Sequence, residues 1–143
     1  MIKPTNLIKR ITVLLADDNK GVRDGFRDLV ELEDDLEVIG EAKNGRQAVA
    51  MAKRLRPAVV LMDIAMPVLS GLQATLEILK ALPDTKVLMI SAHTEDVYVE
   101  ESTRSGAMGF LVKQTAADSL CCAIRELQKG NTFFSSSISS SLV

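Results

Sequence analysis

Three aspartates, a serine and a lysine stand at the ends of separate apolar runs, where together they could bind a metal ion and a phosphoryl group. Asp17 and Asp18 follow run 11–16, Asp63 follows 58–62, Ser91 follows 86–90, and Lys113 follows 109–112. Clustered carboxylates repel one another unless a cation is present, and such oxygen ligands suit Mg²⁺. A serine hydroxyl and a lysine ammonium can both contact phosphoryl oxygens.

The elements that must position these residues alternate along the chain. The four runs above are nearly continuous in apolarity, which is typical of strands buried on both faces of a parallel sheet. A fifth run at 36–42 is more polar and suits an edge strand. Segments with helical spacing separate the runs, the least regular being 94–105. The pattern predicts an α/β fold, (βα)₅, with a doubly wound parallel five-stranded sheet and helices on both faces.

This fold predicts where the polar residues meet. In doubly wound sheets, ligands bind outside the carboxyl ends of the strands. All five polar side chains fall at that edge, whereas the pair Asp34-Asp35 precedes a strand and should lie at the opposite edge. Taken alone, Asp17-Asp18 is explained as well by capping of the next helix. The shared placement of Asp63 and Lys113 favours a metal and phosphate site.

Composition limits the remaining possibilities. The length of 143 residues argues for a single domain. The formal net charge of −2 argues against binding of nucleic acid by these residues, since nucleic-acid binders carry a basic surface. We find no credible secretion signal or membrane span, and the only cysteines, Cys121 and Cys122, are adjacent, so we expect a cytoplasmic protein. An acidic stretch near 31–37 is interpreted as a solvated helix end and loop.

The domain boundaries follow from the same pattern. Residues 1–10 form a polar N-terminal extension, and 11–130 form the domain. The Ser-rich segment 131–143 has no further strand or long helical pattern and is interpreted as a tail or the start of a linker.

Asp63 is the candidate nucleophile because a single carboxylate at a strand end can attack phosphorus and form an acyl phosphate. An aspartate-nucleophile phosphatase would use related chemistry, but it places an Asp-x-Asp pair after its first strand. In this chain the residue two positions after Asp63 is Ala65, so the second aspartate of such a pair is missing. A nucleotide or flavin binder is disfavoured because the turn at 16–21 has no glycine-rich phosphate cradle.

These motifs resemble the receiver domain of two-component response regulators over about residues 11–130. The matching segments are Leu15-Ala16-Asp17-Asp18, Leu61-Met62-Asp63-Ile64-Ala65-Met66-Pro67 with Gly71, Ile90-Ser91-Ala92 and Gly109-Phe110-Leu111-Val112-Lys113. The resemblance implies the flavodoxin-like strand order 2-1-3-4-5. It also implies a phosphorylation-activated switch that phosphorylates itself and slowly hydrolyses the product, rather than a turnover enzyme.

The resemblance assigns a role to each site residue. Asp63 would accept a phosphoryl group from the phosphohistidine of a sensor histidine kinase. The Mg²⁺ ligands would be Asp18, Asp63, the backbone carbonyl of Ala65 and, mainly through water, Asp17. The phosphoryl-contacting and switch residues would be Lys113, Ser91 and the aromatic Phe110, and the residues that tune access would be Ala92 and His93.

Details of the sequence also resemble the NarL/FixJ (LuxR-type) subgroup, notably Ile90-Ser91-Ala92-His93, Lys113-Gln114 and the segment 130–135. In that subgroup a linker leads to a helix-turn-helix DNA-binding domain, so DNA would be bound only through an output domain outside these residues. A homodimer is compatible with this assignment, and a stand-alone receiver that acts by protein contact is the alternative. Receivers commonly have proline after the lysine, and Gln114 replaces it here, so a trans bond is expected.

Overall fold

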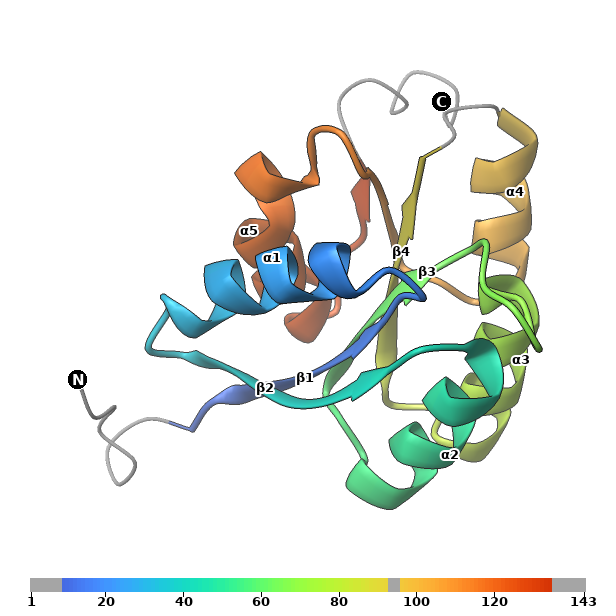
Figure 1. The fold of residues 1–143 in the computed structure, drawn as a ribbon, viewed down its shortest axis with the longest axis horizontal. Coiled ribbons are helices and arrows are strands. Elements are labelled where there is room, and N and C mark those ends of the chain that lie inside the picture. Colours follow the sequence, from blue (N-terminus) through green and yellow to red (C-terminus); the bar gives the residue numbers. More distant parts are fainter. Residues whose placement is uncertain (1–8, 93–95, 135–143) are drawn as a thin grey trace.

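The computed structural model describes residues 9–92 and 96–134. One sheet carries helices on both faces (Figure 1). The strands are β1 (Ile11–Ala16), β2 (Leu36–Ala42), β3 (Val59–Asp63), β4 (Lys86–Ser91), β5 (Gly109–Val112) and β6 (Phe133–Phe134). The helices are α1 (Lys20–Glu31), α2 (Gly45–Leu55), α3 (Gly71–Ala81), α4 (Asp96–Arg104) and α5 (Ala116–Gln128).

All strand pairs are parallel, and the order is β2-β1-β3-β4-β5-β6. The first five strands therefore follow the predicted order, with the more polar β2 at one edge. The prediction of five strands and of no strand after Gly130 was wrong in one detail. Two residues, Phe133 and Phe134, pair with Gly109 and Phe110 and add a short sixth strand. Two residues are too few to produce a recognisable strand pattern in the sequence.

Two apolar clusters hold the layers together, one on each face of the sheet. Helices α1 and α5 cover one face through residues such as Val30 and Leu120, and α2, α3 and α4 cover the other through residues such as Ala48 and Ile78 (Figure 1). Strand β3 is buried along its whole length, as its continuous apolarity predicts. No helix in the described part of the chain is long and apolar enough to cross a membrane.

Helix starts agree with local sequence chemistry. The side chains of Asn19, Asn44 and Ser70 each accept a hydrogen bond from a backbone N–H in the first turn of α1, α2 and α3, respectively. Each cap follows the carboxyl end of a strand. The caps therefore fix how the chain leaves the edge that carries the candidate site.

Candidate functional site

The three predicted aspartates meet at the carboxyl edge of the sheet. One carboxylate oxygen each from Asp17, Asp18 and Asp63 lies within 4.8 Å of the others. Strand register explains the convergence: Ala16 pairs with Met62, so Asp17 and Asp63 leave neighbouring strands at the same level. Asp17 and Asp63 are buried, and Asp18 is exposed at the rim. A compact set of carboxylate oxygens open to solvent on one side fits a hard divalent cation.

Lys113 lies against two of the carboxylates. Its Nζ is 3.0 Å from Oδ2 of Asp17 and 3.3 Å from Oδ2 of Asp63. The backbone N–H of Lys113 donates to the carbonyl of Ser91 at 2.8 Å, which ties the turn after β5 to the end of β4. The ammonium is thus held where it can contact both the aspartates and a group bound to them.

The phosphoacceptor candidate has a perturbed acidity. Burial, the largest effect, and the negative charge of Asp17 raise the pKa of Asp63 to about 6, against the opposing effects of Lys113 and of a hydrogen bond from the backbone N–H of Ala65. Burial disfavours the charged form of Lys113, but a hydrogen bond to Asp17 and the charges of Asp63 and Asp17 outweigh it and raise the pKa of the ammonium. The pocket therefore holds excess negative charge that one lysine does not neutralise.

The loop after β1 orients Asp17 through several hydrogen bonds. The backbone N–H of Asp17 donates to the carbonyl of Ala42 at 3.1 Å, and Oδ1 of Asp17 accepts from the backbone N–H of Asn19 at 2.8 Å. These contacts leave Oδ2 of Asp17 directed at Lys113.

The loop after β3 is packed tightly under Asp63. The backbone N–H of Gly71 donates to the carbonyl of Ile64 at 2.8 Å. A Cβ at position 71 would lie 2.0 Å from the carbonyl oxygen of Asp63, so only glycine fits without a backbone shift. Gly71 thus lets α3 begin directly against the strand end that carries the phosphoacceptor candidate.

The remaining predicted residues lie around this cluster. Ser91 is buried at the end of β4, Ala92 is exposed just beyond it, and Ala65 is exposed in the loop after β3. Phe110 is fully buried with Val99 and belongs to the core rather than to the carboxylate cluster. The prediction for His93 lies outside the described residues. The Lys113–Gln114 bond is trans, as expected without proline.

Sequence reasoning missed Arg23. This residue is only 5% exposed, and its Nη1 donates to the backbone carbonyl of Asp17 at 2.7 Å. Its spacing of three and seven residues from Phe26 and Val30 places it on the buried face of α1, which is the signal that could have identified it.

Comparison with known proteins finds similarity to response regulator receiver domains. A family profile described as "Response regulator receiver domain" matches residues 13–125. The chain is 42% identical over 125 residues to the "Uncharacterized transcriptional regulatory protein YxjL" of Bacillus subtilis, covering 87% of this chain and 57% of that protein. It is 36% identical over 124 residues to the "Response regulator protein VraR" of Staphylococcus aureus, covering 87% and 59%. The chain thus spans little more than half the length of these curated relatives.

Solved structures show the same likeness. The signal receiver domain of the putative response regulator NarL from Mycobacterium tuberculosis superposes with a TM-score of 0.81 at 31% identity, covering 86% of this chain and 99% of that one. A LuxR-family two-component response regulator from Aurantimonas superposes with a TM-score of 0.88 at 26% identity, covering 92% and 94%.

Proposed function

Because this chain belongs to the response regulator receiver domain family, we propose that it is a phosphorylation-activated switch in the cytoplasm, in which Asp63 accepts a phosphoryl group from a sensor kinase phosphohistidine. The observation that carries this proposal is the position of Lys113. Its ammonium bridges Asp17 and Asp63 in a cluster of three carboxylates at the carboxyl edge of the sheet.

The transfer exchanges one bond to phosphorus for another. A carboxylate oxygen of Asp63 attacks, the P–N bond of the phosphohistidine breaks, and a P–O bond forms while the imidazole leaves with the electron pair. The attack needs the ionised carboxylate. With a pKa of about 6, Asp63 is mostly ionised at neutral pH, and Lys113 stands beside it to contact the transferred group.

The residues present fit a magnesium ion. Three carboxylate oxygens within 4.8 Å of one another form a hard oxygen donor set. Asp18, Asp63 and the Ala65 carbonyl would hold the ion directly, and Asp17 would act mainly through water. When bound, Mg²⁺ supplies positive charge that stabilises the oxygens of the phosphoryl group.

The signal would be read by groups next to the site. Phosphorylation adds roughly 1.5–2 negative charges. Ser91 and Lys113 would contact the added oxygens, and Ala92 leaves room for them. Phe110 would couple the change to the surface formed by α4, β5 and α5, since it lies on β5 and packs in the same core cluster as Val99 of α4. The protein would then work as a switch, with its hydrolysis serving only to reset it.

The output would be transcriptional. The YxjL relative carries the description of a transcriptional regulatory protein, and this chain spans 57% of it. We therefore propose that phosphorylation controls a DNA-binding output domain joined after the receiver. The gene sequence beyond the codon for Val143 tests this part: an open frame encoding a helix-turn-helix supports it, and a stop codon favours the stand-alone receiver.

Phosphorylation itself is tested with a small phosphodonor. Wild-type protein incubated with Mg²⁺ and acetyl phosphate should gain one phosphoryl group by intact-mass spectrometry, and chelation of the metal should abolish the gain. Asp63→Asn should not be modified, because an amide oxygen is a poor nucleophile.

Asp34→Asn is the matched control, since Asp34 is an exposed aspartate beyond the opposite end of the sheet. It should be phosphorylated like the wild type. Normal modification of Asp63→Asn would show that another residue is the acceptor, and modification without metal would remove the role assigned to the aspartate cluster.

A further inference from the structure

A charged side chain of α1 is buried directly behind the aspartate cluster. Arg23 is 5% exposed although it carries a guanidinium group. With Asp17 and Asp63 it lines a small cavity of about 10 Å³ beneath the site. Burial of an arginine is costly unless its charge and its hydrogen-bond donors are satisfied. Its partners therefore indicate what the residue does.

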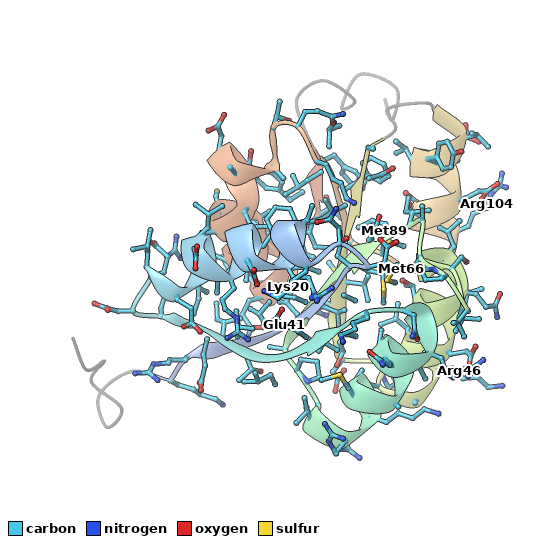
Figure 2. All side chains as sticks on the ribbon, in the orientation of Figure 1. Lys20, Glu41, Arg46, Met66, Met89 and Arg104 are labelled. Carbon is cyan, nitrogen blue, oxygen red and sulfur yellow. The ribbon has the colours of Figure 1, made fainter. Side chains whose placement is uncertain are left out.

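The guanidinium of Arg23 has two partners on different elements. Nε donates to Oε1 of Glu41 on β2 at 3.1 Å, and Nη1 donates to the backbone carbonyl of Asp17 at 2.7 Å. Glu41 also forms an ion pair with Arg27, one turn further along α1, and lies on β2 beside that helix (Figure 2). The carboxylate of Glu41 compensates the charge of Arg23. The Nη1 donor of the guanidinium is then available to bind the Asp17 carbonyl.

The carbonyl of Asp17 belongs to the peptide unit that leads into Asp18. A peptide unit is planar, so fixing its oxygen also fixes the direction in which the chain enters Asp18. The preceding peptide is held separately, because the N–H of Asp17 bonds to Ala42. The side chain of Asp18 is exposed at the rim, where surrounding water does not fix its orientation. Arg23 thus holds the oxygen of the Asp17–Asp18 peptide directly, while the bond from the Asn19 N–H to Oδ1 of Asp17 closes the turn around it.

We propose that Arg23, aligned by Glu41, is a positioning residue that holds the Asp17–Asp18 peptide so that both carboxylates face a divalent cation. This inference rests on the proposed function, because it concerns the same metal site. It assigns a role in metal affinity to two residues that do not touch the metal. Lysine cannot substitute, since a point charge lacks the rigid fork that reaches both partners.

The test compares Arg23→Lys with Arg27→Gln. Both residues contact Glu41, but Arg27 is half exposed and is not one of the residues lining the cavity. Mg²⁺ affinity measured by calorimetry should fall about tenfold in Arg23→Lys, the size of effect typical of residues that orient metal ligands. It should stay within about twofold in Arg27→Gln, as expected for an exposed pair.

A metal-free measurement separates positioning from general destabilisation. The Asn19 amide bonds to Asp17, so its hydrogen exchange should accelerate in Arg23→Lys without Mg²⁺, while amides in the middle of β3 keep their protection. With acetyl phosphate, the variant should need about tenfold more Mg²⁺ for half-maximal modification but reach the wild-type rate at saturation.

Each outcome has one meaning. Wild-type Mg²⁺ affinity in Arg23→Lys overturns the inference and leaves the proposed function intact, whereas a wild-type protein that neither binds Mg²⁺ nor gains a phosphoryl group overturns the proposed function. If Arg23→Lys does not fold, Glu41→Gln decides, because it keeps an acceptor for Arg23 but removes the charge. Its Mg²⁺ affinity should fall about two- to fivefold, less than the loss typical of a directly orienting residue, and an unchanged affinity again overturns the inference.

Discussion

The molecule has an acidic cluster at each end of its sheet. Each cluster forms ion pairs with one cationic side chain, which comes from the turn before α5 in one case and from α5 in the other. At the carboxyl edge, Lys113 pairs with Asp17 and Asp63. Beyond the amino edge, Arg125 of α5 binds Asp35 through two hydrogen bonds of 2.8 Å and Glu33 through one of 2.6 Å. Both clusters contain more carboxylates than cations. Their surroundings nevertheless differ.

The difference is solvent. The side chains of Asp17 and Asp63 are 5% and 4% exposed, whereas those of Glu33 and Asp35 are 37% and 39% exposed. Water screens the second cluster, and the Arg125 fork uses its donors in charge-assisted hydrogen bonds. In the first cluster, burial leaves the repulsion uncompensated and raises the pKa of Asp63. Burial, together with the charge of Asp17, therefore distinguishes the cluster in which the pKa of a carboxylate is raised from the one that braces α5.

The largest effect should come from disturbing the packing that buries the cluster at the carboxyl edge. Gly71→Ala places a Cβ 2.0 Å from the Asp63 carbonyl oxygen, which the backbone must move to avoid. We expect a loss of about 3 kcal/mol or more in the free energy of unfolding, measured with urea. No stability loss would mean that the β3–α3 junction is not tightly packed.

Gly25→Ala is the control for that measurement. Gly25 lies in α1, and no neighbouring group comes within 4 Å of the place that a Cβ would take there, so alanine should stabilise the helix by about 0.5–1 kcal/mol. Changes of opposite sign in the free energy of unfolding would show that the loss at position 71 comes from the close packing there and not from replacing a glycine in general.

Removing negative charge from the two clusters should affect Mg²⁺ affinity very differently. Asp17→Asn with Asp18→Asn should weaken Mg²⁺ binding by about a hundredfold, since affinity depends on the number of charged ligands. Asp35→Asn, in the screened cluster, should change Mg²⁺ affinity by less than about twofold. Calorimetric titration measures both. Similar losses in the two variants would show that the ion responds to overall charge and not to the predicted site.

Much of this site followed from the sequence because strand ends in a parallel sheet must share an edge. Runs 11–16 and 109–112 became β1 and β5 with the predicted bounds, since buried strands are continuous apolar runs. The (βα)₅ pattern predicted that Asp17 and Asp63 share one edge, and the strand order that the resemblance implied, with the first and third strands adjacent, is the observed one. The comparisons confirm the resemblance to receiver domains and to the NarL and LuxR-type regulators.

What sequence reasoning did not identify depends on contacts between distant residues. Arg23 was missed because charge normally predicts solvent exposure, and its burial is tolerable only through its contacts with Glu41 on β2 and with the carbonyl of Asp17. The acidic stretch was interpreted as a solvated loop, but Arg125 binds two of its members. Strand β6 depends on the pairing of Phe133 and Phe134 with Gly109 and Phe110, which exists only in the folded sheet. None of these pairings leaves a periodic signal along the chain.

Neutralising Asp63 should stabilise the metal-free fold. The raised pKa means that ionised Asp63 opposes folding, a cost that develops as pH rises from the unfolded value of 3.8 to about 6. Asp63→Asn at pH 7.5 should therefore be more stable than wild type by about 1–2 kcal/mol, a figure reduced for the solvent that reaches the pocket. At pH 5 the advantage should shrink, because the folded wild type is then protonated. Urea titrations at the two pH values check this, and Mg²⁺ should favour the wild type alone.

The smallest effect should come from the brace. Arg125→Met keeps the apolar stem of the side chain and removes the fork that binds Asp35 and Glu33. We expect a loss of about 1 kcal/mol in the free energy of unfolding and unchanged phosphorylation of Asp63, because the pair is partly exposed. Arg46→Met, which breaks the more exposed pair with Glu77, should cost less than about 0.5 kcal/mol. If Arg125→Met instead altered Mg²⁺ affinity or phosphorylation, the two acidic clusters would be coupled through α5, and burial alone would not explain why their properties differ.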